Sequence, residues 1–442
     1  MTRESESHRE SEPRRESRSR RGFLAGIAAA GAAATAGCSG VPFAGGEERR
    51  EAPASLPSDA VGPVEWPASP FPVTVPESLA STHESRTREL LDAVPAEASI
   101  PNEAVAAAIG DDRERASRRA NAEIPDGWPV DDLSAWRHRR EDAAAVRGAH
   151  RAATGTDDGV DLAARRRAVR DDRGALASGL EYRAESPAAA VLAYEPVESL
   201  LAECARHVEP RVTYPDDPIA EPFRAGEVVG HVERARAAAS DAEGLRDAYL
   251  DGRDGATSQW ASLVAAAGQL RGSVSRTRAA VRRRTNDGTP SGDEDLSGTV
   301  AQELLAVSGR RAESAVTDAE RAADAGEHAT AVIEAGTGLA DIEARRRAVA
   351  EIGDGRFREV PSESSVRSAA ERAHTAVRDA VERGGPLARR LVRPGVETLA
   401  YVADRIEEGY ASPRRTQAEL AYVDLYAGAV PATTAFVRER LA

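Results

Sequence analysis

Apolar residues recur at spacings of three and four along most of the chain after Pro76, which predicts amphipathic helices. The clearest helix is expected over residues 297–323, and most of its apolar stripe is alanine. Small side chains bury little apolar area each, so many helices are needed to build a core. No stretch of strand length alternates convincingly between apolar and polar residues, and residues 356–360 come nearest. The predicted stripe consists of Val300, Leu304, Val307, Ala312, Ala315, Val316, Ala319 and Ala322.

The fold class expected from this pattern is all-α, an irregular antiparallel helical bundle. The densest prolines after Pro76 lie in residues 210–222, and we interpret them as a connector between two sub-bundles, residues 76–209 and 223–442. Residues 322–328 faintly resemble the turn of a tetratricopeptide unit. The landmarks of that unit do not recur at a fixed period, so an irregular bundle is the better interpretation.

The first 75 residues have a different pattern. An Arg20-Arg21 pair precedes Phe23-Leu24, a short Ala/Gly-rich run and then Cys38 directly after Ala-Gly. That run is too short and too weakly apolar for a stable membrane span. Residues 39–75 are rich in Gly and Pro, which is typical of a disordered, partly extended tether.

Residues 19–38 resemble the signal of a twin-arginine-exported lipoprotein. The resemblance implies that residues 1–37 are a signal peptide, that Arg20 and Arg21 address the export machinery, and that Cys38 carries lipid. It departs from the commonest pattern at Ala25 and Thr35, where lysine and a larger aliphatic residue are usual. The implied location is the extracytoplasmic face of the cell membrane, with residues 38–75 as the lipid-bearing tether.

The net charge of the 442 residues is −14, and every basic residue other than histidine is an arginine. Without residues 1–37 the charge is about −16, which opposes nucleic acid binding. An acidic, Ala-rich chain without lysine resembles the exported proteins of salt-loving archaea. In such salt the Debye length falls to a few ångströms, so the self-repulsion would be screened.

The missing lysine excludes Schiff-base enzymes, Walker-type phosphate loops and Ser-x-x-Lys nucleophiles. With Cys38 lipidated, Cys204 remains as a lone thiol, and a small buried residue is the favoured interpretation. No Gly-x-Ser-x-Gly or His-Glu-x-x-His motif is present. The chain is therefore more consistent with a non-enzyme, and no cofactor is predicted.

Glutamate–histidine pairs three or four residues apart on a helix are the candidates for metal binding. Glu371 and His374 have the Glu-x-x-His spacing of di-iron bundles, but a solvated helix face explains one such pair better. Glu203 and His207 are one turn apart, as are Glu227 and His231, and the two pairs flank the proline cluster, so they could meet. We predict no metal site. Residues 293–298 resemble the start of an EF-hand loop, but helix capping is the favoured interpretation, because loop position twelve is Leu304 and not a carboxylate.

The sequence therefore predicts a lipid-anchored cell-surface protein with a non-catalytic structural or interaction role. Its expected partners are the membrane, through the lipid, and other cell-surface proteins. The alternative is a solute- or metal-binding accessory protein of a membrane transporter. A pocket lined by convergent polar groups would favour this alternative, whereas a smooth helical rod would favour the structural role.

Overall fold

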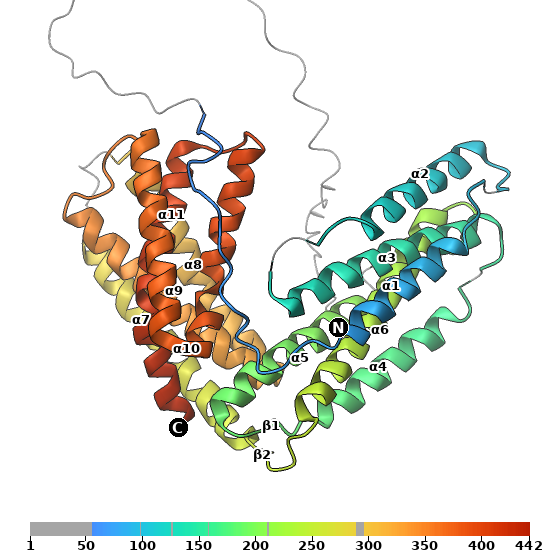
Figure 1. Cartoon of the computed structure of the whole chain (residues 1–442), viewed down its shortest axis with the longest axis horizontal. Helices are drawn as coiled ribbons and strands as arrows, with labels where there is room; N and C mark the ends of the chain where they lie inside the picture. The colour runs from blue at the N-terminus through green and yellow to red at the C-terminus, as the bar shows by residue number, and fades with distance from the viewer. Residues whose placement is uncertain (1–54, 98, 125–126, 158, 210–211, 289–295) are drawn as a thin grey trace, which may run out of the picture. The chain divides into compact units, whose positions relative to one another are not determined.

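The computed structural model describes residues 55–97, 99–124, 127–157, 159–209, 212–288 and 296–442. Residues 50–442 form one compact unit, and Arg20, Arg21, Cys38 and the EF-hand-like residues 293–295 lie outside the described part. The predicted all-α class is confirmed: the described residues form eleven helices and one pair of two-residue strands (Figure 1). In chain order these are α1 (Glu77–Asp92), α2 (Glu103–Ala120), α3 (Pro129–Ala153), α4 (Leu162–Ser178), β1 (Arg183–Ala184), α5 (Pro187–Val208), α6 (Pro222–Leu250), β2 (Thr257–Ser258), α7 (Trp260–Gly288), α8 (Val300–Asp324), α9 (His328–Gly353), α10 (Glu363–Glu407) and α11 (Pro413–Leu441).

Helices α1 to α6 pack around the pair α3 and α6 (Figure 1). Small residues let these two backbones approach closely. A Cβ atom on Gly226 would lie 2.3 Å from the carbonyl oxygen of Ala145, and one on Gly148 would lie 2.9 Å from Val229 Cβ. The predicted boundary at residues 210–222 is therefore wrong, because α6 folds back onto α3 after the prolines.

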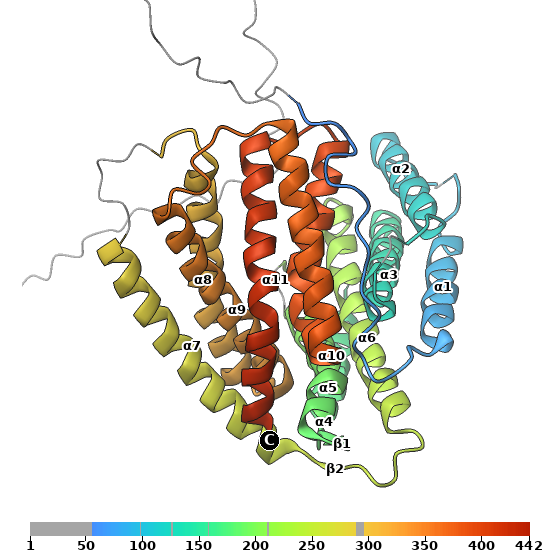
Figure 2. The ribbon, with the colours of Figure 1, turned by 60° about the vertical axis from the view of Figure 1, so that its left-hand side comes forward.

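Helices α7 to α11 form the second group, with α11 between α10 and the α8–α9 pair (Figure 2). The predicted stripe of the α8 segment is confirmed, since each of its eight residues is buried. Helix α10 has a break at Gly385, whose φ of 65° is not helical. Helix α11 continues through Pro431.

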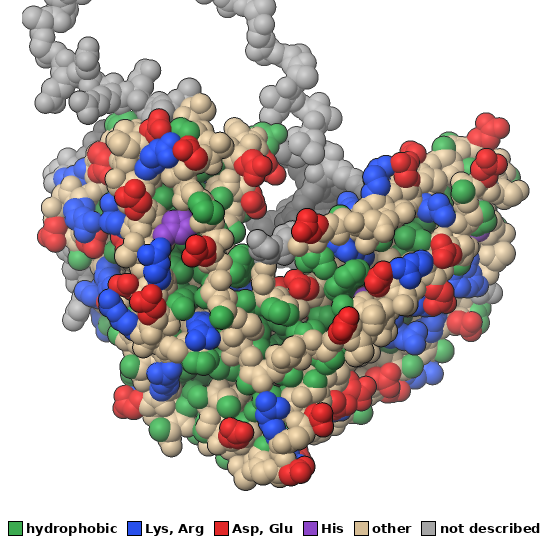
Figure 3. Space-filling model, in the orientation of Figure 1, with side chains coloured by type: hydrophobic (Ala, Val, Ile, Leu, Met, Phe, Trp, Pro, Cys, Tyr) green, Lys and Arg blue, Asp and Glu red, His purple; other side chains and the backbone are tan. Residues whose placement is uncertain are grey.

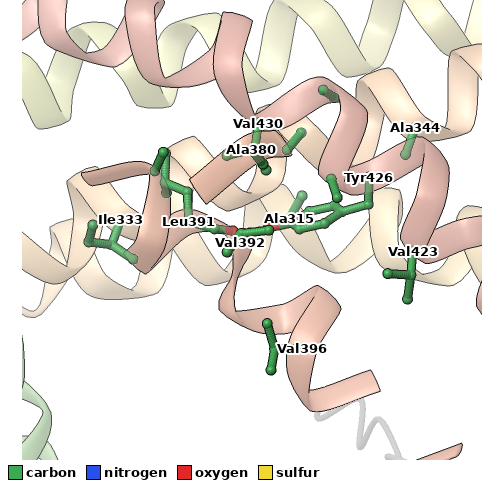
Figure 4. Close-up of a cluster of buried hydrophobic side chains, with 14 of the residues drawn as sticks. Ala315, Ile333, Ala344, Ala380, Leu391, Val392, Val396, Val423, Tyr426 and Val430 are labelled. Atoms are coloured by element: carbon green, nitrogen blue, oxygen red, sulfur yellow. The ribbon is translucent and has the colours of Figure 1, made fainter. Parts of the chain in front are cut away.

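The core of the second group is a tight mixture of alanine, branched aliphatic residues and tyrosine from α8 to α11 (Figure 4). Ala315 of α8 lies where a Cβ on Gly338 of α9 would approach to 2.8 Å. Tyr426 fills the space beside Leu391, and its hydroxyl donates a hydrogen bond of 2.6 Å to that residue's carbonyl oxygen. Alanine thus brings the helices close, and a few large side chains supply the buried area.

Helix α5 joins the two groups, because it packs on both α6 and α9. Its buried Glu198 accepts hydrogen bonds from the backbone amides of Ala329 and Thr330, at 3.1 and 2.7 Å. These amides belong to the first turn of α9, which has no side-chain cap of its own. Glu198 therefore supplies the acceptor that this helix terminus needs, and its charge suits the positive end of the helix dipole. The hydroxyl of Tyr182 adds a third hydrogen bond of 2.6 Å.

Residues 55–75, which we call the strap, pack along the helical body, so the prediction of a disordered tether is wrong for them (Figure 1, blue). Ala60 and Val61 are buried in the core of the second group. Asp59 forms an ion pair of 2.8 Å with Arg367 of α10. At the other end of the strap, the carbonyl oxygen of Pro67 accepts a hydrogen bond of 2.8 Å from the indole of Trp128.

Helix α11 has the length and apolar composition that would allow it to cross a membrane, but 67% of its most apolar window is buried inside the fold. On the face of the molecule seen in Figure 3, arginines and carboxylates are intermixed over the outer surfaces of the helices. Many of them form pairs within one helix, such as Arg88 with Glu84 and Arg383 with Asp379. Exposed pairs of this kind contribute little stability each.

A buried ion network crosses the first helix group. Arg137 of α3 donates to Glu203 of α5 and to Asp241 of α6, at 2.8 Å in each case. Arg234 of α6 donates to the same Glu203 at 2.6 Å. His83 of α1 completes the chain through a 2.8 Å contact with Asp241. The exposed fractions of Arg137, Glu203 and Asp241 are only 3%, 7% and 1%.

We predict that Glu203→Ala lowers the free energy of unfolding by about 3–5 kcal/mol, because it leaves two buried guanidinium groups without their shared carboxylate. The matched control is Glu209→Ala, which removes an exposed partner of Arg170 at the end of the same helix and should cost less than about 1 kcal/mol. Denaturant unfolding of both variants measures the difference. Equal losses would contradict a structural role for the network.

Candidate functional site

The described part of the protein contains a cavity of about 450 Å³ where α5 meets helices of both groups. Its wall is formed by α3, α5, α8, α9 and α10, and Phe71 of the strap closes one side. Two prolines inside helices, Pro196 of α5 and Pro394 of α10, face this cavity. A proline inside a helix removes one backbone hydrogen bond and frees the carbonyl four residues earlier. The cavity thus lies where two helices are locally irregular.

Most charges in the cavity wall are paired. Arg390 donates to Glu195 at 2.7 Å, and both side chains are almost completely buried. Burial alone would raise the pKa of Glu195, but the facing Arg390 guanidinium outweighs it and holds the pKa below its usual value. Arg393 contacts Asp131 at 2.9 Å and Glu397 at 2.6 Å. These pairs form a fixed, charged wall.

An aromatic cluster packs against this wall. The ring of Trp128 lies 5.5 Å from that of Phe71 and 6.0 Å from that of Trp66, with edge-to-face geometry. The guanidinium of Arg393 lies 5.1 Å from the Trp128 ring centre, a cation–π distance. Trp128 is therefore a packing residue that also contacts Arg393, a residue of the cavity wall.

Four charged residues of the wall form no ion pair within the ranges that the structure describes: Arg206, Arg311, Glu334 and Asp341. The side chain of Glu334 is half-buried, and burial raises its pKa. Arg311 is exposed, and its guanidinium lies 5.9 Å from the ring of Tyr422. The cavity therefore offers unsatisfied charges of both signs to a guest molecule.

Asp341 is a buried residue of the cavity wall and accepts a hydrogen bond from the hydroxyl of Tyr422. Burial raises the pKa of Asp341 to about 7, although the hydrogen bond and the nearby Arg311 lower it in part. This carboxyl group consequently changes its charge near neutral pH. It is the most strongly perturbed acid in the cavity wall.

The polar lining of the cavity consists of charged side chains and hydroxyl groups. Hydroxyl groups of Ser134, Ser199, Ser314 and Thr337 line it, but no histidine or cysteine does among the described residues. The lone thiol, Cys204, is fully buried, and burial raises its pKa to about 11. The interpretation of Cys204 as a small buried residue is confirmed.

A second cluster lies on the outer side of the buried ion network. The rings of His207 and His231 are 5.5 Å apart between centroids, and Glu141 of α3 approaches both. One potential ligand atom from each of the three residues lies within 4.8 Å of the others. The two histidines that flank the proline cluster therefore do meet, but Glu141 joins them instead of Glu203 or Glu227.

The other metal candidates from the sequence do not converge. Glu203 is occupied by Arg137 and Arg234 in the buried network. His374 contacts the carbonyl oxygen of Val61 in the strap at 3.0 Å, and Glu371 is an exposed residue of α10. The solvated-face interpretation of this helix stretch thus holds for Glu371, whereas His374 anchors the strap.

Two family models match the chain. Residues 78–255 are similar to a domain of unknown function (DUF8262), and residues 260–439 are similar to another domain of unknown function (DUF8264). No curated protein and no solved structure matches. The gap between the two matches falls at the connection between α6 and α7, which agrees with the division into helix groups α1–α6 and α7–α11.

The raised pKa of Asp341 predicts a pH-dependent stability. Between the unfolded value of about 4 and the folded value of about 7, the native state binds more protons than the unfolded state. Stability from this group therefore falls as pH rises through that window. We therefore compare the free energy of unfolding of Asp341→Asn with that of wild type at two pH values by denaturant unfolding. The variant should gain about 2–4 kcal/mol relative to wild type between pH 5 and pH 8.

Proposed function

We propose that this chain is an extracytoplasmic binding protein, held at the membrane by lipid on Cys38, that takes a small polar solute into its central cavity. The observation that carries the proposal is the unpaired charge in the cavity wall. A smooth helical rod would have no such cavity, so the binding alternative is favoured over the structural role.

The wall suits a small zwitterion. The guanidinium of Arg311 can receive an anionic group in bidentate geometry, and Glu334 can receive a cationic group. The remaining surface is a mixture of hydroxyl groups and the apolar faces of Phe71 and Leu200. A cavity of about 450 Å³ is within the size range of small-molecule sites, which begins at roughly 300 Å³.

The strap supports the same proposal. If Cys38 carries lipid, the chain between it and the packed strap comprises residues 39–54, and it can span at most roughly 60 Å. The helical body would then stay close to the membrane surface. That is a suitable position for a protein that passes a solute to a transporter in the same membrane.

We predict that a zwitterionic amino acid raises the thermal midpoint of the full chain, whereas an analogue lacking one of the two charges does so less. The probes are the twenty protein amino acids with their decarboxylated and deaminated analogues. When the probe concentration is one hundred times its dissociation constant, binding adds about 2.7 kcal/mol to the free energy of unfolding. The gain in thermal midpoint should be lost in Arg311→Gln and in Glu334→Gln.

The matched controls are Arg378→Gln and Glu382→Gln, two exposed positions of α10 outside the cavity wall. They should keep the full gain. A panel in which no probe raises the midpoint would reject the binding role in favour of the structural one. A gain that survives both cavity variants would mean that the probe binds elsewhere, and would reject this cavity as the site.

The anchor is tested separately. In a host that exports and lipidates proteins by this route, we expect wild type in the membrane fraction and Cys38→Ser released from it. Cys204→Ser is the matched control, because Cys204 is a buried thiol of the folded body. Equal membrane retention of wild type and Cys38→Ser would rule out lipidation at this residue.

A further inference from the structure

Three helices place one metal-binding side chain each at the same point. His207 lies in the last turn of α5, His231 in the first half of α6, and Glu141 in the middle of α3, on which α6 packs. The Nε2 atom of His231 lies 3.7 Å from a carboxylate oxygen of Glu141. One potential ligand atom from each of the three residues lies within 4.8 Å of the other two.

These distances are close to those of a loaded site. Ligand atoms bound tetrahedrally to Zn²⁺ at about 2.0–2.1 Å lie roughly 3.3 Å from one another. The observed separations therefore require a contraction of about 1.5 Å or less. Small side-chain rotations supply such a movement, and no helix has to shift.

The carboxylate is already oriented. Arg234 donates to one oxygen of Glu141 at 2.7 Å, and the other oxygen faces His231. Arg234 is itself held by Glu203 at 2.6 Å, in the buried network. A hydrogen bond to the non-coordinating atom of a ligand fixes its orientation and is typical of metal sites.

The local charge does not oppose a cation. Arg234 and Arg137 are offset by Glu141, Glu203 and Asp241, which leaves this group with an excess of one negative charge. Burial lowers the pKa of His207, and the nearby Arg234 adds to that effect. A neutral imidazole has a free nitrogen lone pair for a metal.

We propose that Glu141, His207 and His231 form a binding site for a late first-row divalent cation of the Zn²⁺ class. Two imidazoles and one carboxylate are the donor set that such ions take, whereas Ca²⁺ and Mg²⁺ prefer oxygen ligands alone. The side chains of His231 and Glu141 are 24% and 15% exposed, so solvent reaches the site. A water molecule or a second ligand can occupy the fourth position.

The test uses the full chain without a polyhistidine tag, stripped with a chelator and titrated with Zn²⁺ against a chromophoric competitor. We expect one tight Zn²⁺ per chain. The variants Glu141→Gln, His207→Ala and His231→Ala should each weaken it at least tenfold. Co²⁺ is a second probe: wild type should develop the visible absorption of a four-coordinate site, and the double variant His207→Ala/His231→Ala should not.

The matched control is Glu371→Gln/His374→Ala, which removes a glutamate and a histidine from α10 and should leave Zn²⁺ affinity unchanged. Helicity and thermal midpoint without metal show that each variant is folded. Unchanged Zn²⁺ affinity in the folded double variant, or an equal loss in the control, would overturn the proposal. Neither result affects the conclusion about solute binding in the cavity, because solute binding is measured with metal-free protein.

Discussion

The packing of the first helix group depends on one shared carboxylate. Glu203 of α5 accepts hydrogen bonds from Arg137 of α3 and from Arg234 of α6, and all three residues are at most 9% exposed. A buried charge without a partner costs several kcal/mol, so the three helices have to keep the register in which these atoms meet. Only arginine can do this here: its planar donors bridge two carboxylates at once, and the chain contains no lysine.

The same carboxylate lies between the two candidate sites. Arg137 and Glu203 belong to the cavity wall, and Arg234 extends from Glu203 to the carboxylate of Glu141 in the histidine cluster. The cavity and the histidine cluster are therefore connected through the same ion pairs. A shift of α5 would move both sites, because His207 lies only one turn after Glu203 on that helix.

Periodicity predicted what is local in this fold, such as the buried stripe of α8. It could not predict which helices pack together. The prolines of residues 210–222 mark an irregular connection, but the chain returns from it to α3 because Gly148 and Gly226 permit a close approach there. The meeting of His207 with His231 could be anticipated, since both flank that connection. The contribution of Glu141 could not, because it depends on long-range packing.

The strap shows why composition alone misjudged residues 55–75. Each proline removes one backbone N–H group, so a Pro-rich segment has fewer donors that need a partner when it lies against a protein surface. What decides between a free tether and a packed strap is whether apolar side chains occur between the prolines. Here Val61, Trp66 and Phe71 do, and each packs on the helical body or on Trp128. The prolines then reduce the entropy lost on packing, because their φ angles are fixed in the unfolded chain as well. The same residues that suggested a spacer thus stabilise a wall of the cavity.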